Sequence, residues 1–162
     1  MPEPVPAYIA LGANLGEPAV QIERALEELA KLPDSRVVGR SRLYLSRPAG
    51  YADQPDFVNA VARLDTTLSA RDLLDRLLEL EHRHGRVRSF RNSPRTLDLD
   101  ILLYDRLILS EPGLHLPHPR MHERPFVLLP LAEIAPDLDI PGFGSVAGLA
   151  ANQPTEGIRP LS

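Results

Sequence analysis

The chain has 162 residues, of which 43% are hydrophobic and 25% charged, and it contains no cysteine. This composition is typical of a globular protein, and it excludes disulfides and thiolate metal sites. The net charge of −4 argues against a nucleic-acid or anionic-membrane partner, because such partners select basic surfaces. We expect one domain over residues 1–162. The N-terminal sequence MPEP does not resemble a secretory signal, so we expect a cytoplasmic location.

Strand and helix signals alternate through the first 45 residues. Residues 7–11 (AYIAL) form an apolar run that predicts a buried strand. Residues 12–16 (GANLG) predict a tight turn into a helix. A phosphate-binding loop is less favoured, because the segment lacks the Gly-Lys-Ser/Thr ending of such loops. Pro18 opens that helix and Pro33 ends it. Residues 37–45 predict a second strand.

A loop separates the second strand from the third. Residues 46–56 (SRPAGYADQPD) are rich in turn-forming residues. Residues 57–64 predict the third strand, in which Phe57, Asn59 and Val61 share one face.

A second helix follows the third strand, with Ser69 as its N-cap and His84 near its end. The arginine-rich segment after it contains Pro94 and predicts irregular structure. Further along, we expect a strand over 97–104, a short edge strand over 107–109, and helices over 126–134 and 146–151. The element order βαββαβ is typical of a ferredoxin-like α+β sandwich, a mainly antiparallel sheet with flanking helices.

Two acidic residues interrupt the apolar run of the predicted strand 97–104. Side chains alternate between the two faces of a strand, so Leu97, Leu99 and Ile101 share one face while Asp98 and Asp100 share the other. The Cα atoms of the two aspartates then lie about 6.5 to 7 Å apart, close enough for both carboxylates to bridge hard cations. The alternative is that both are simply solvated on a wet face of the sheet.

Basic residues gather on both sides of this strand. Five arginines lie within residues 83–95, and their planar forks suit phosphate contacts. His118 and His122 lie four residues apart after the strand, but the prolines around them argue against a zinc-binding helix. We therefore expect a loop histidine that donates to a phosphate. Glu81 is either a surface charge or an anchor for an arginine or ligand hydroxyl.

The combination and order of the motifs resemble one family. They include residues 8–16 (YIALGANLG), 54–60 (QPDFVNA), 85–88 (GRVR), 94–100 (PRTLDLD) and 117–124 (PHPRMHER). Together they resemble the 6-hydroxymethyl-7,8-dihydropterin pyrophosphokinases of folate biosynthesis, from about residue 7 to residue 137. The resemblance implies an enzyme that transfers pyrophosphate from ATP to the pterin hydroxymethyl group and releases AMP.

The resemblance also implies roles for individual residues on the ATP side. Asp98 and Asp100 match positions that hold two Mg²⁺ ions, and Arg86 and Arg95 match positions that act on the phosphates during transfer. The positions that match ATP contacts or line the nucleotide site are Glu81, Arg88, Ile101, His118 and Arg124.

For the pterin, the resemblance implies that aromatic side chains stack on the two faces of the ring and that an amide forms hydrogen bonds with its edge. Phe57 and Phe126 match the two stacking positions, and Asn59 matches the amide that reads the ring edge. The backbone around Ser46, Ala49 and Gly50 completes the pocket. The implied partners are ATP and the pterin, and we expect a monomer.

Two other functions fit parts of the pattern. A different metal-dependent transferase or hydrolase of nucleotides would also use paired aspartates. A ferredoxin-like RNA-binding module would use the arginines, but the negative net charge and the lack of an aromatic, basic strand speak against it.

Overall fold

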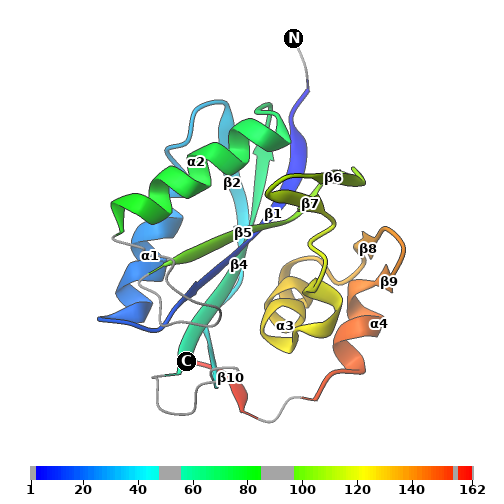
Figure 1. Ribbon diagram of the computed structural model, residues 1–162. Helices are drawn as coiled ribbons and strands as arrows, with labels where there is room; N and C mark the ends of the chain where they lie inside the picture. Colours follow the sequence, from blue (N-terminus) through cyan, green and yellow to red (C-terminus); the bar gives the residue numbers. More distant parts are fainter. Residues whose placement is uncertain (1–2, 48–55, 85–96, 155–156, 162) are drawn as a thin grey trace.

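One central strand organises the fold. β1 (Val5–Ala13) lies between β4 (Phe57–Thr66) and β5 (Asp98–Tyr104) and runs antiparallel to both. β2 (Ser35–Arg40) and β3 (Tyr44–Ser46) pair with successive parts of β4, and β10 (Ile158–Pro160) pairs with β3 (Figure 1). The computed structural model describes residues 3–47, 56–84, 97–154 and 157–161.

Helices cover both faces of this sheet. α1 (Pro18–Leu29) and α2 (Ala70–Arg83) pack on one face, and α3 (Pro125–Ile134) and α4 (Val146–Ala151) on the other (Figure 1). The predicted α+β class with a mainly antiparallel sheet and flanking helices is confirmed. α1 and α2 form one helical layer, and α3 and α4 form a second layer on the opposite face. No helix in the described ranges is long and apolar enough to cross a membrane.

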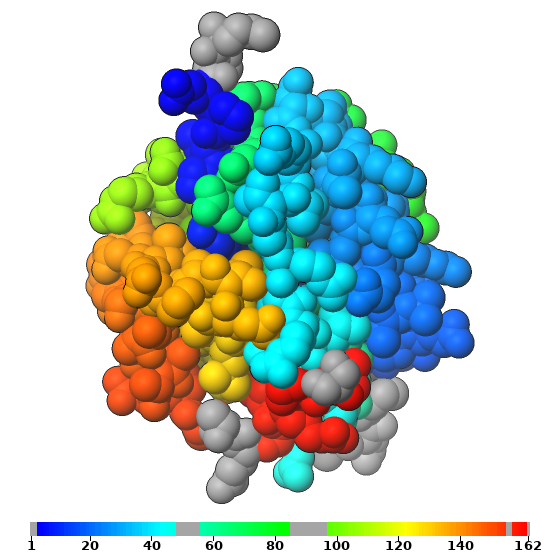
Figure 2. All heavy atoms as spheres, turned by 180° about the vertical axis from the view of Figure 1, so that it is seen from behind, coloured from blue at the N-terminus to red at the C-terminus, as the bar shows by residue number. Residues whose placement is uncertain are grey.

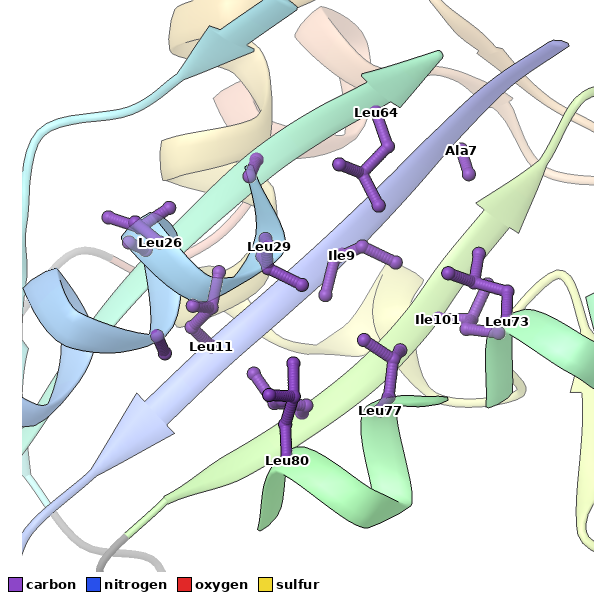
Figure 3. Close-up of a cluster of buried hydrophobic side chains, with 14 of the residues drawn as sticks. Ala7, Ile9, Leu11, Leu26, Leu29, Leu64, Leu73, Leu77, Leu80 and Ile101 are labelled. Carbon is purple, nitrogen blue, oxygen red and sulfur yellow. The ribbon is translucent and has the colours of Figure 1, made fainter. Parts of the chain in front are cut away.

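Alternation along β1 supplies both hydrophobic cores. Ala7, Ile9, Leu11 and Ala13 point toward α1 and α2, where they meet side chains from β4, β5 and both helices (Figure 3). Tyr8 points the other way, toward α3 and α4. A strand buried on both faces must be apolar at nearly every position, which explains the continuous apolar run in the sequence.

Several predicted boundaries agree with the structure. The Ser69 side chain accepts a hydrogen bond from the Asp72 amide and caps α2, and α4 has the expected bounds. The expected edge strand over 107–109 is displaced: β6 (Leu109–Glu111) pairs with β7 (Leu114–Leu116), which the sequence reading missed. β8 (Asp139–Ile140), β9 (Gly144–Ser145) and a 3₁₀ turn, Met121–Glu123, complete the described elements.

The predicted strand over 37–45 is broken into β2 and β3. At the break, the Ser41 amide donates to the Val61 carbonyl (2.9 Å), while the Val61 amide donates to the Ser41 hydroxyl (3.0 Å). That hydroxyl also donates to the Arg42 carbonyl (2.7 Å). The Ser41 hydroxyl thus replaces one backbone acceptor of the ladder, so the backbone groups of β4 stay hydrogen-bonded where β2 and β3 are interrupted.

Replacing Ser41 by Ala should lower the free energy of unfolding by about 1 to 3 kcal/mol, because the Val61 amide loses its acceptor at a site where Ser41 is only 1% exposed. Urea denaturation measures the change. Ser110→Ala, at an exposed position on β6, is the control and should stay close to wild type. Equal stability of the two variants would contradict the structural role of this hydroxyl.

Candidate active site

A cavity of about 300 Å³ lies on the sheet face that carries α3. Its walls come from β1, β3, β4, β5, α3 and the segment that precedes α3. Among the residues that line it are Ala10, Gly12, Ser46, Arg47, Phe57, Asn59, Asp98, Asp100, His118, Arg120, Arg124 and Phe126. The cavity therefore collects side chains from distant parts of the chain.

Strand register places the polar side chains of β4 and β5 on opposite sides of β1, which forms the floor of the cavity. Gly12 of β1 pairs with Asn59 on β4 and with Asp98 on β5, so these three residues form one row across the sheet. In the next row, Ala10 lies between Val61 and Asp100. Two small residues of β1, Gly12 and Ala10, thus separate the amide side from the carboxylate side.

Gly12 lies within a strand, where the lack of a side chain leaves space in the cavity. A Cβ atom at this position would lie 3.3 Å from the Asn59 Oδ1 atom, a tight contact. The sequence reading of residues 12–16 as a turn is right for Gly16, which has φ of +66°, but wrong for Gly12, which lies within β1. Glycine here leaves the Asn59 amide and the floor of the cavity accessible.

The carboxylate side is built on the outer strand of the sheet. Asp98 and Asp100 line the cavity, whereas Leu97, Leu99 and Ile101 are buried in the core beneath α1 and α2, as strand alternation predicted. Between the two aspartates, the Leu99 amide donates to the Glu81 carboxylate (2.7 Å). Glu81 is 3% exposed, so it is not a surface charge. It fixes the backbone that carries both aspartates.

An irregularity in β5 anchors the segment that contains His118. The register of β5 against β1 shifts at Tyr8, which makes Leu102 an extra residue, and the Leu102 carbonyl accepts a hydrogen bond from the His118 amide (2.9 Å). The Arg120 amide donates to the His118 Nδ1 atom (3.2 Å). With Nδ1 as acceptor, the neutral ring carries its proton on Nε2, a donor available to a ligand.

Burial, helped by the nearby positive charges of Arg124 and Arg120 and partly opposed by Asp98, lowers the pKa of the His118 imidazole to about 4. The ring is therefore neutral at physiological pH. His122 has a different environment, because its ring stacks on Phe143 with 4.0 Å between centroids. Among the described residues, no three His, Asp or Glu side chains lie close enough together to form a metal-binding group.

The opposite side of the cavity carries the aromatic and amide groups. The Asn59 Nδ2 atom donates to the Ser46 hydroxyl (2.6 Å), and both residues are buried. Phe57 and Phe126 line the cavity from β4 and α3. The Arg124 guanidinium lies 5.7 Å from the centre of the Phe126 ring, a cation–π arrangement that orients both side chains.

The structure brings together eight of the predicted site residues: Ser46, Phe57, Asn59, Asp98, Asp100, His118, Arg124 and Phe126. Arg86, Arg88, Arg95, Ala49 and Gly50 lie outside the described residues. The side chains of Glu81 and Ile101 do not line the cavity. Their contacts with ATP stay predictions.

Some lining residues were missed by the sequence reading. Gly12 and Ala10 matter through their neighbours on β4 and β5, which no local pattern reveals. Arg120 could have been found from its place within the PHPRMHER motif. Arg47 carries no pattern signal, because it stands in a loop-like stretch.

Comparison with known proteins identifies the family. Residues 8–136 match the family described as 7,8-dihydro-6-hydroxymethylpterin-pyrophosphokinase (HPPK). The chain belongs to the HPPK family. The 2-amino-4-hydroxy-6-hydroxymethyldihydropteridine pyrophosphokinase of Pseudomonas aeruginosa is 53% identical over 154 residues, which are 95% of each chain. The Haemophilus influenzae protein of the same name is 50% identical over 137 residues, covering 85% of this chain and 86% of that one.

A solved HPPK structure supports the fold. The wild-type HPPK-DHPS of Plasmodium falciparum, crystallised with pteroate, superposes with a TM-score of 0.70 at 14% identity. The match covers 93% of this chain but only 43% of that longer protein. Together, the matches confirm the HPPK family, the pyrophosphokinase class and the reaction predicted from the sequence.

Replacing Gly12 by Ala should weaken pterin binding and leave ATP binding nearly unchanged. The added methyl group would press on Asn59 Oδ1 and fill the floor of the cavity, at a cost of about 1 to 3 kcal/mol. Isothermal titration with a pterin and, separately, with a non-hydrolysable ATP analogue measures both affinities. Gly39→Ala, on β2 with nothing within 4 Å of the new Cβ, is the control. An equal loss of affinity for the pterin and for the ATP analogue would contradict a pterin-specific role of Gly12.

His118 should titrate with a midpoint near pH 4 in the ligand-free protein, observable by NMR of the imidazole nitrogens. The unfolded chain binds this proton near pH 6.5, so the folded state loses up to about 3 kcal/mol as the pH falls from 6.5 to 4. Above pH 6.5 the residue adds no pH dependence. His118→Gln should remove this part of the acid destabilisation. A midpoint near 6.5 would contradict the burial of the ring.

Proposed function

We propose that this cavity transfers the pyrophosphoryl group of ATP to the hydroxymethyl oxygen of 6-hydroxymethyl-7,8-dihydropterin. The new bond joins that oxygen to the β-phosphorus, the bond from the β-phosphorus to the oxygen bridging to the α-phosphorus breaks, and AMP leaves. One observation carries the proposal: two carboxylates line the same cavity as two phenylalanine rings and an asparagine, and on β1 only Gly12 and Ala10 lie between the β4 and β5 groups.

Asp98 and Asp100 are proposed to hold two Mg²⁺ ions. Their chemistry fits this ion, because Mg²⁺ is commonly bound by one or two carboxylates together with water and substrate phosphates. Their neighbours fit as well, since the Glu81 carboxylate and the β1 pairing fix the strand on both sides. When bound, the ions would neutralise the phosphates and orient them for in-line displacement.

The side chains after β5 are proposed to hold the phosphates. A neutral His118 donates from Nε2 without adding charge, and Arg124 supplies a fixed cation next to it. Arg86, Arg88 and Arg95 are proposed to complete this group from the segment between α2 and β5. Donors of this kind are typically worth about 2.7 to 4 kcal/mol of transition-state stabilisation each.

The groups near β3 and β4 are proposed to bind the pterin. Phe57 and Phe126 would stack on its two faces, while Asn59 reads its edge with a donor and an acceptor. The Ser46 hydroxyl fixes the orientation of that amide before the ligand arrives. Preorganisation of this kind raises affinity because less freedom is lost on binding. The backbone at Ala49 and Gly50 is proposed to complete the pocket.

Two further expectations belong to this proposal. The first is that the enzyme is a monomer. The dependence on ATP supports a cytoplasmic location.

The purified protein, given Mg²⁺, ATP and the hydroxymethylpterin, should form AMP and the pterin diphosphate. Asp98→Asn and Asp100→Asn should each lower kcat by about 100-fold or more, because the charge that holds the metal is reduced. Coupled detection of AMP measures the rate. Asp75→Asn, at an exposed position on α2, is the matched control and should keep full activity. Formation of ADP would indicate an ordinary kinase, and full activity of both site variants would refute the metal assignment.

A further inference from the structure

We propose that the C-terminal strand β10 positions the Arg47 side chain at the pterin end of the cavity, where the guanidinium donates hydrogen bonds to the pyrimidinone edge of the pterin. The inference rests on the proposed function, because it takes the pterin as the ligand of that end. It assigns a role in substrate binding to a residue and a strand that the mechanism above does not use.

Arg47 stands at the correct end of the site. It follows Ser46 at the end of β3 and lines the same cavity as Asn59. Neighbouring strands lie about 4.8 Å apart, so the three strand steps from β3 to β5 separate the backbone at the end of β3, next to Arg47, from the backbone of the aspartates by about 14 Å. That separation places Arg47 with the pterin groups and away from the metal side. Within the described ranges, Arg47 forms no ion pair with a carboxylate.

The C-terminal strand β10 and the residue before it pack next to the Arg47 side chain. β10 pairs with β3 so that Ile158 lies opposite Ser46, and the Leu161 amide donates to the Leu43 carbonyl (2.9 Å). In Figure 2 the C-terminal segment, in red, lies against the cyan segment that contains β3. Gly157, just before β10, has φ of +79°, and a Cβ there would lie 3.1 Å from Arg47 Cδ and 3.2 Å from Cγ. The stem of Arg47 therefore rests directly on the Gly157 backbone.

The pterin edge needs donors that Asn59 alone does not supply. One of the two Nδ2 protons of Asn59 is already donated to Ser46, which leaves one donor and one acceptor for the ligand. Phe57 and Phe126 are proposed to take the two ring faces, so a further side chain at this end meets the edge. The guanidinium offers up to five N–H donors, and the pyrimidinone carbonyl has two lone pairs.

The family match ends at residue 136, well before β10. Gly157 therefore lies outside the range that the family model matches, whereas Arg47 lies within it.

Steady-state kinetics on four full-length variants test the proposal. Arg47→Ala should raise the KM for the pterin about tenfold, as expected for loss of a charge-assisted hydrogen bond, with the KM for ATP unchanged. Gly157→Ala should raise the pterin KM by a smaller factor, because the new methyl group displaces the arginine stem. The double variant should match Arg47→Ala alone, since the glycine acts only through the arginine. Arg47→Lys should restore part of the affinity.

Gly113→Ala is the matched control. Gly113 has a similar φ of +76° in the turn between β6 and β7, but nothing lies within 4 Å of its new Cβ. It shares the backbone strain of Gly157→Ala without the contact to Arg47, so both KM values should stay at the wild-type level. If Gly157→Ala does not fold, Gly157→Asn replaces it, because asparagine tolerates a positive φ.

An unchanged pterin KM in Arg47→Ala would overturn the contact. Additive effects in the double variant would overturn the positioning by β10. Failure of the proposed function gives a different result: the wild-type protein would form no AMP, or Asn59→Ala would leave the pterin KM unchanged.

Discussion

The antiparallel pairing of β1 with β4 and β5 is the constraint on which the rest of the structure depends. Because β1 is buried on both faces, its alternate residues must fill one core and leave room in the other. Toward the site, its side chains shrink from Tyr8 through Ala10 to Gly12, and the cavity opens where they are smallest. The same pairing fixes Asn59 on one side of Gly12 and Asp98 on the other. A slip by one residue would turn every one of these groups to the wrong face.

The strand with the aspartates lies at an edge of the main sheet, which makes its support necessary. An edge strand has backbone groups without strand partners, and two neighbouring carboxylates repel each other. Here the Glu81 carboxylate accepts from the Leu99 amide, and the Leu102 carbonyl accepts from the His118 amide. α2 and the segment before α3 thus complete the outer edge of β5. These bonds link the orientation of the aspartates to the position of the neutral histidine.

Local patterns predicted the elements and their faces, whereas contacts between distant elements were beyond them. Alternation alone placed Asp98 and Asp100 opposite Leu99, and the Ser69 cap was visible in the sequence. The role of Gly12 depends on its register with two other strands, so the segment 12–16 taken alone predicts a turn. Glu81 was undecided between the surface and an anchor, because its partner lies 18 residues away across the arginine-rich segment. The break at Ser41 was hidden for the same reason: its hydroxyl finds Val61 only after β4 has paired.

The central claim is that Gly12 separates a phosphate side from a pterin side within one cavity. A crystal structure with Mg²⁺, a non-hydrolysable ATP analogue and the hydroxymethylpterin tests this claim most directly. The account predicts electron density for the metal at Asp98 and Asp100, and the pterin ring across Gly12 with its edge on Asn59. A pterin bound on the far side of the aspartates, or a metal held without them, would contradict it.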